Sequence, residues 1–144
     1  MTLPFITGLR HVGVIVEDRQ ATTSRLVELF GLPAEQVELI PPEHDTDVLT
    51  RFAFLHLPDV VIELIEPVSQ QFREQLLTRG PGADHICFTV TDLGAAIETM
   101  TARGAHLGHV TPNGPVTTPS FRLAYFDPTT TGGLLIELIE PKTG

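Results

Sequence analysis

The sequence predicts an α+β fold built from two tandem βαβββ modules. Three observations predict it: an internal repeat, a regular order of apolar runs and turn residues, and enough apolar residues for one core. The repeat appears in four pairs of landmarks 74 residues apart: VIELIEP (61–67) and LIELIEP (135–141), HVGVIVED (11–18) and HICFTVTD (85–92), Phe52 and Phe126, and Ala21 and Ala95. Four landmarks in one register indicate a duplicated module of roughly 70 residues.

Each module opens with an apolar strand and a capped helix. The runs RHVGVIV (10–16) and DHICFTV (84–90) are rich in β-branched residues and continuously apolar, which is typical of strands buried on both faces. Asp18 and Asp92 follow them, and each can accept a hydrogen bond from the free N–H groups of a helix that begins there. The expected helices are RQATTSRLVELF (19–30), ending at Gly31, and LGAAIETMTARG (93–104), ending at Gly104.

Three further strands complete each module. They are expected at QVELI (36–40), TRFAFLHL (50–57) and VVIELIE (60–66) in module one, and at AHLGHV (105–110), FRLAYF (121–126) and GLLIELIE (133–140) in module two. Two loops dense in turn residues interrupt this plan: PPEHDTD (41–47) and TPNGPVTTPS (111–120). We expect a single domain, 1–144, with module one at about 8–67, a linking helix at about 69–80 that ends at Gly80, and module two at about 83–141.

Composition limits the classes of partner. The chain has 144 residues, 42 % hydrophobic, which suits one compact domain, and a net charge of −9, which argues against binding to nucleic acid phosphates or anionic membranes. Its single cysteine, Cys87, cannot form an internal disulfide, and we expect it to pack inertly in a core strand. With no apolar run near the roughly 20 residues of a membrane span and no signal-like start, we expect a soluble, cytoplasmic protein.

Polar residues interrupt the apolar strands at equivalent places in the two modules. Strand side chains alternate between faces, so Glu63 shares a face with the aliphatic Val61 and Ile65, and Glu137 is placed in the same way. A carboxylate in that setting is costly unless it is paired, protonated or bound to a metal. His11 and His85 open the first strands, again 74 residues apart.

These four side chains fit one divalent metal. Two neutral imidazoles and two carboxylates would be charge-balanced, and their nitrogen and oxygen atoms suit Co, Ni, Mn, Zn or Fe. Any one of them alone would ordinarily be a solvated or capped residue. Their recurrence at one spacing favours the metal hypothesis. By contrast, Glu66 and Glu140 repeat equally well, but they precede prolines at the strand ends, where a solvated or structural role is expected.

The runs LRHVGVIVED, VVIELIEP, GPGADHICFTVTDLGAAIETMTARGA and DPTTTGGLLIELIEP resemble the vicinal oxygen chelate superfamily (glyoxalase/bleomycin resistance protein/dioxygenase). Within it they are most similar to the methylmalonyl-CoA epimerases. The resemblance implies that the modules form an incomplete, cupped β-barrel around one metal, in a cytoplasmic homodimer that binds an acyl-CoA substrate. It places the ligands on His11, Glu63, His85 and Glu137.

The resemblance also implies two proton-transfer groups. Epimerases use the metal-bound glutamate that matches Glu137, together with a carboxylate from the loop before the second pair of strands. This chain offers Glu43, Asp45 and Asp47 there, of which we rank Glu43 first because it follows the two prolines. The expected reaction is removal of the proton α to a thioester carbonyl, with stabilisation of the enolate oxygen.

Two other functions fit the same resemblance. Epimerases commonly have Gln where this chain has Glu63, whereas bacterial glyoxalases I use a His, Glu, His, Glu set, so a lactoylglutathione lyase is the first alternative. A non-catalytic small-molecule binder of the same fold is the second, although such binders often lack the metal set.

Overall fold

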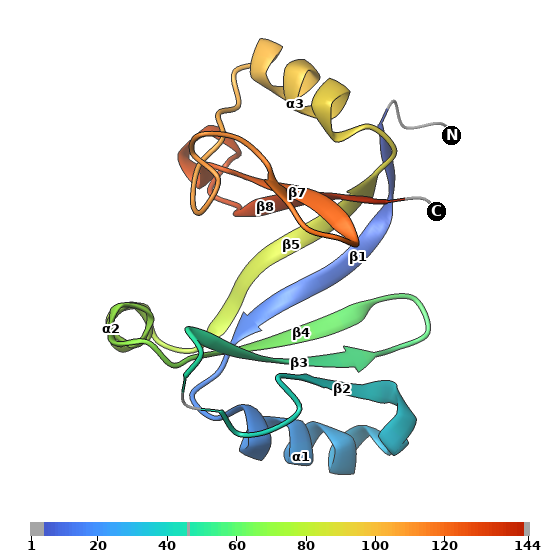
Figure 1. The fold of residues 1–144 in the computed structure, drawn as a ribbon, viewed down its shortest axis with the longest axis vertical. Helices are drawn as coiled ribbons and strands as arrows, with labels where there is room; N and C mark the ends of the chain where they lie inside the picture. Colours follow the sequence, from blue (N-terminus) through green and yellow to red (C-terminus); the bar gives the residue numbers. More distant parts are fainter. Residues whose placement is uncertain (1–4, 46, 143–144) are drawn as a thin grey trace. The chain divides into compact units, whose positions relative to one another are not determined.

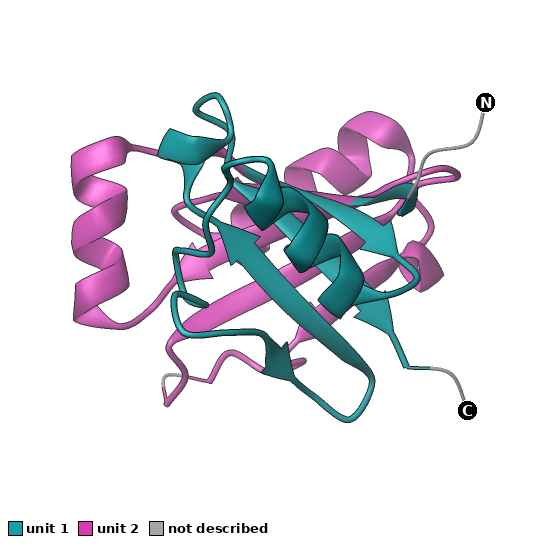
Figure 2. Cartoon of the chain, turned by 90° about the horizontal axis from the view of Figure 1, so that it is seen from above, with its two compact units in different colours: residues 1–10, 85–144 teal, residues 11–84 magenta. Residues whose placement is uncertain are grey.

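The computed structural model describes residues 5–45 and 47–142, in a chain that divides into two compact units. Unit 1 takes residues 1–10 and 85–144, and unit 2 takes residues 11–84 (Figure 2). The first strand, β1 (Ile6–Ile15), therefore begins in unit 1 and ends in unit 2. Each predicted module corresponds to most of one unit.

Unit 2 contains a four-stranded sheet with one helix packed on it. Its further elements are α1 (Arg19–Phe30), the 3₁₀ turn η1 (Ala34–Gln36), β2 (Val37–Ile40), β3 (Thr50–His56), β4 (Val61–Pro67) and α2 (Gln70–Arg79). The strand order is β2-β3-β4-β1, with β1 parallel to β4 and the other pairs antiparallel. Helix α1 packs on β3 and β4 (Figure 1), and α2 is the predicted linking helix.

Unit 1 repeats this plan. Its elements are β5 (Gly82–Val90, whose first residues belong to unit 2), α3 (Leu93–Ala102), β6 (Val116–Thr117), β7 (Phe121–Phe126), η2 (Pro128–Thr130) and β8 (Ile136–Pro141). The strand order is β5-β8-β7-β6, with β5 parallel to β8 and the rest antiparallel. Helix α3 packs on β7 and β8 (Figure 1).

The repeat holds at the level of strand pairing. In unit 2, Gly13 lies opposite Glu63, and in unit 1, Cys87 lies opposite Glu137. All four positions are related by the offset of 74 read from the sequence. The duplication of the parallel strand pair is therefore confirmed residue by residue.

The landmark pair Phe52 and Phe126 was wrong. Phe52 lies opposite Ile65, whereas Phe126 lies opposite Ile136, which is not the equivalent residue of β8. The antiparallel strands β3 and β7 are instead related by 71 residues. Unit 1 has three more residues between β7 and β8, where η2 lies, and these extra residues shift the alignment of the preceding strand.

The predicted strand AHLGHV (105–110) was also wrong. Only Leu107 forms a bridge there, to Phe126, before the chain turns. At Gly108 a Cβ atom would lie 3.0 Å from the backbone of Asp127, and His109 has a positive φ of 56°. The Thr111 hydroxyl then accepts a hydrogen bond from the Tyr125 amide (2.8 Å). A side chain thus pairs with the backbone of β7 here, and the neighbouring strand is the short β6, inside the predicted loop.

The helix caps are as the sequence predicts at three of four ends. The Asp18 and Asp92 carboxylates accept hydrogen bonds from the amides of Ala21 and Ala95, both at 3.0 Å. Gly31 ends α1 with φ 67°, a left-handed conformation that glycine adopts without strain. Helix α3 differs, because its C-cap is Arg103 and not Gly104, which follows.

Replacing either capping aspartate with alanine is expected to lower the free energy of unfolding by about 1 kcal/mol. The reason is that each substitution leaves helix N–H groups without an acceptor. Urea unfolding followed by circular dichroism measures the loss. Glu98→Ala, which removes an exposed carboxylate from the middle of α3, is the control and should change stability little. Equal midpoints for Asp18→Ala, Asp92→Ala and the control would contradict the capping role.

Each unit has its own apolar core on the helix-facing side of its sheet. In unit 2 it is formed by Val16, Ala53, Leu55 and Leu64. The core of unit 1 comprises Val90, Leu93, Ala96, Ala105, Ala124, Phe126 and Leu138. No helix within residues 5–45 and 47–142 is long and apolar enough to cross a membrane.

Candidate functional site

Unit 2 brings His11 and Glu63 together. His11 lies two residues before Gly13, which is opposite Glu63, so both side chains are on one face of the β1/β4 pair. The distance from His11 Nε2 to Glu63 Oε2 is 3.7 Å. His11 does not open its strand as expected, because β1 begins five residues earlier, at Ile6.

Unit 1 makes the same pair from His85 and Glu137. The register of β5 and β8 again places the histidine two residues before the partner of the glutamate. His85 Nε2 lies 3.1 Å from Glu137 Oε1. All four side chains of the two pairs are buried, with exposed fractions between 3 and 8 %. The sequence prediction that each histidine belongs with the glutamate of its own module is therefore confirmed.

The donor set of these pairs fits a divalent transition metal. Buried carboxylates carry a large desolvation cost, which an imidazolium or a cation offsets. Each pair presents one imidazole nitrogen and one carboxylate oxygen within a few ångströms, on parallel strands that hold both rigidly. Such mixed nitrogen and oxygen sets bind Zn, Co, Ni, Mn and Fe.

The two pairs have different neighbours. Tyr125 lies opposite Glu137 on β7, with its ring edge-on to His85 at 5.4 Å and to His109 at 4.9 Å. The residue opposite Glu63 is Phe54, which has no hydroxyl. Sequence reasoning missed Tyr125, although it is the single tyrosine of the chain and lies on a predicted strand.

Cys87 is fully buried, as expected, but its face is not the expected one. It lies directly opposite Glu137 and so shares the face of His85 and Glu137. The core residues of β5, such as Val90, are on the other face, which packs against α3. The equivalent position in unit 2 is Gly13, so the thiol is a feature of one repeat only.

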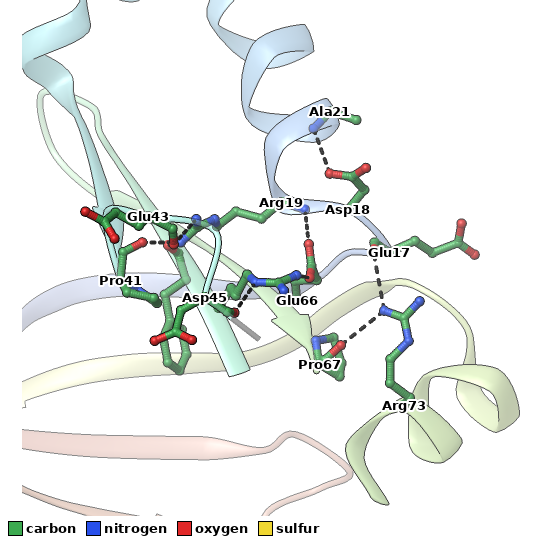
Figure 3. Close-up of polar contacts among 12 residues, drawn as sticks. Glu17, Asp18, Arg19, Ala21, Pro41, Glu43, Asp45, Glu66, Pro67 and Arg73 are labelled. Carbon is green, nitrogen blue, oxygen red and sulfur yellow. Dashed lines mark hydrogen bonds and ion pairs between the residues drawn. The ribbon is translucent and has the colours of Figure 1, made fainter. Parts of the chain in front are cut away.

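The three loop carboxylates have different surroundings, although all are exposed. Asp45 is engaged locally, since its carboxylate accepts a hydrogen bond from the Asp47 amide at 2.8 Å. Glu43 differs: among residues 5–45 and 47–142, none bonds its carboxylate. In Figure 3 this carboxylate points away from Arg19, which instead contacts the Glu43 backbone carbonyl.

Glu66 has a structural role, which was one of the two expectations for it. Its carboxylate is buried and pairs with Arg51, and it also accepts a hydrogen bond from the Arg19 amide at the start of α1 (2.7 Å). A cavity of about 290 Å³ lies beside this group, with His44 and Arg73 on its other sides. Glu140, its equivalent, is less buried and pairs with Arg122 at 3.4 Å.

Sequence reasoning also missed the two buried arginines, Arg19 and Arg51. One signal for Arg19 was available: a cation in the first turn of a helix is unfavourable, because the N-terminal end of the helix dipole is positive. An arginine there indicates a specific partner elsewhere in the fold.

Comparisons with known proteins agree with this architecture. A family model described as the glyoxalase/bleomycin resistance protein/dioxygenase superfamily matches residues 10–126. The chain is 29 % identical over 105 residues to an ethylmalonyl-CoA/methylmalonyl-CoA epimerase of Cereibacter sphaeroides, covering 71 % of this chain and 75 % of that protein. It is 25 % identical to the mitochondrial methylmalonyl-CoA epimerase of Dictyostelium discoideum, covering 94 % and 79 %.

Among solved structures, the methylmalonyl-CoA epimerase of Mycobacterium tuberculosis superposes with a TM-score of 0.79 at 28 % identity, covering 99 % of this chain and 93 % of that one. The α+β fold class with two βαβββ modules is thereby confirmed. The chain belongs to the glyoxalase/bleomycin resistance protein/dioxygenase superfamily, as its resemblance indicated.

Proposed function

We propose that the chain is a divalent-metal-dependent isomerase that removes the proton α to a thioester carbonyl, as a methylmalonyl-CoA epimerase does. The observation that carries the proposal is the buried histidine and glutamate pair, which recurs in the same strand register in both units. The kinship to two methylmalonyl-CoA epimerases adds the substrate class, an acyl-CoA. The family resemblance adds a homodimer, which light scattering of the purified protein tests.

In this proposal His11, Glu63, His85 and Glu137 hold one metal ion, which is Co, Ni, Mn, Zn or Fe, inside the cup formed by the two modules. When bound, the ion supplies positive charge that stabilises the developing enolate oxygen. The burial of all four side chains supports this role, because a water-poor site strengthens electrostatic stabilisation.

The proton chemistry is assigned to two carboxylates on opposite sides of the substrate. Glu137 takes the α-proton of one epimer on a carboxylate oxygen, and Glu43 delivers a proton to the other face of the same carbon. The free Glu43 carboxylate supports its choice over Asp45, whose carboxylate already accepts the Asp47 amide. Two such bases are what inversion at carbon needs.

Incubation of the metal-loaded protein with methylmalonyl-CoA in D₂O tests the proposal. We expect deuterium to replace the α-proton, followed by NMR, together with inversion of the stereocentre, followed by chiral chromatography of the acyl group. Protein lacking added metal is the control and should exchange slowly. A folded, metal-loaded sample that leaves the α-proton in place would contradict the proposal.

A second candidate is glyoxalase I-like isomerisation of a glutathione hemithioacetal. It is favoured by Glu63, because a carboxylate at this position completes a His, Glu, His, Glu set. The same metal-loaded sample, mixed with methylglyoxal and glutathione, decides between the two. Formation of the thioester product, with no exchange of methylmalonyl-CoA, would select the lyase. Inactivity in both assays, with tight ligand binding and no metal, would select a non-catalytic binder.

A further inference from the structure

Three buried residues of unit 2, Arg19, Arg51 and Glu66, form one connected cluster (Figure 3). Their exposed fractions lie between 2 and 6 %. Glu66 joins them, because one carboxylate oxygen pairs with the Arg51 guanidinium and the other accepts the Arg19 amide. Two guanidinium groups share one carboxylate, so each arginine needs further acceptors.

Those further acceptors are backbone carbonyls of the loop that follows β2. Arg19 Nη1 donates to Pro41 O at 2.8 Å, and Arg19 Nη2 donates to Glu43 O at 3.4 Å. Arg51 Nε donates to Asp45 O at 3.0 Å. The cluster therefore holds every second carbonyl from 41 to 45, while the Glu43 carboxylate extends to the opposite side (Figure 3).

The other repeat has no such cluster. The pair Arg51 and Glu66 recurs as Arg122 and Glu140, which are also opposite each other in register, but this second pair is only half-buried. The residue equivalent to Arg19, the first of its helix, is Leu93. Leu93 is fully buried in the core of unit 1. A leucine thus serves the same helix position without any bond to a loop.

Arg19 is held against two electrostatic costs. Burial lowers its pKa below the usual range of an arginine, an effect that Glu66 opposes and Arg51 reinforces. Its place in the first turn of α1 adds the unfavourable end of the helix dipole. Because Leu93 shows that the module folds without an arginine here, these costs are unexplained by the fold itself. The bonds to the loop explain them.

We propose that Arg19, with Arg51 and Glu66, is a positioning group that fixes the backbone of residues 41–45 and thereby aims the Glu43 carboxylate. The part concerning Glu43 rests on the proposed function, whereas the part concerning the loop does not. The three residues touch no substrate in this account; they act through the loop.

Arg19→Leu tests the proposal, because it installs the residue of the other repeat. Arg122→Leu is the matched control, since it removes an arginine from the equivalent sheet position of unit 1. The first readout is the ¹⁵N order parameter of the Glu43, His44 and Asp45 amides. We expect values of about 0.85 in the unmodified protein and the control, and below about 0.6 in Arg19→Leu.

The second readout separates inversion from exchange. In Arg19→Leu we expect the kcat for inversion of methylmalonyl-CoA to fall about 10- to 100-fold, since a misplaced base loses its alignment. Exchange of the α-proton of the epimer served by Glu137 should persist, and KM should change little. A merely structural role would lower both rates together, in proportion to the folded fraction.

Each outcome decides one part of the proposal. Unchanged order parameters in folded Arg19→Leu would overturn the positioning role. A mobile loop with full inversion activity would overturn the link to Glu43. If the unmodified protein neither exchanges nor inverts the substrate, the proposed function and the Glu43 link fail together, while the order parameters still decide the loop. Should Arg19→Leu not fold, Arg19→Lys keeps the charge but lacks the two-pronged donor, and it is judged by the same two readouts.

Discussion

Glu137→Gln is expected to lower turnover of methylmalonyl-CoA by about 10³-fold or more. The substitution preserves shape but removes the negative charge, so the side chain loses its capacity to take the α-proton, a contribution of about 10²–10⁴-fold. It also weakens one of the four proposed metal ligands. The buried position of Glu137, 3.1 Å from His85, makes replacement by a water-borne base ineffective.

Steady-state kinetics of the metal-loaded variant, with its metal content, measures this effect. Glu140→Gln is the matched control, because it removes a carboxylate from the same strand, on the opposite face, where it pairs with Arg122. The control should retain most of the activity. If Glu137→Gln turned over substrate at the unmodified rate, Glu137 would be neither base nor essential ligand.

Glu43→Gln is expected to reduce inversion by about 10²–10⁴-fold while leaving one exchange reaction intact. With its second base gone, the protein still removes and returns the α-proton on the side of Glu137. One epimer should therefore incorporate deuterium from D₂O without changing configuration. No defect of folding or of metal binding produces that separation, which makes the result specific for a two-base mechanism.

Deuterium incorporation and configuration are measured on the same samples, starting from each epimer in turn. Asp47→Asn is the matched control from the same loop, and it should invert the substrate normally. Full inversion by Glu43→Gln would remove Glu43 from the mechanism. If Asp47→Asn then showed the loss instead, the second base would be Asp47.

Local and repeated features were predictable from the sequence. The aspartate caps of α1 and α3 depend on residues three apart in the chain, and the sequence places them correctly. The pairing of His11 with Glu63 and of His85 with Glu137 was also predictable. A duplicated strand pair fixes its own register, and the period of two then determines which side chains share a face.

Features that depend on distant backbone were not predictable in this way. The 105–110 segment has strand composition, yet Gly108 lies against Asp127 and Thr111 bonds the backbone of β7. The arginine cluster was missed for the same reason. Its acceptors are carbonyl groups, which every residue has, so no pattern of side chains reports that a loop will present them to Arg19.

The central claim is that the two pairs of side chains supply one metal site per chain. Elemental analysis of the purified protein, with Glu63→Ala and Glu137→Ala beside it, tests this most directly. The account predicts one divalent transition metal ion per chain in the unmodified protein, and loss of that ion in both variants, although the substitutions lie in different units. Two ions per chain, no affinity for added Co or Ni, or loss in one variant alone would contradict it.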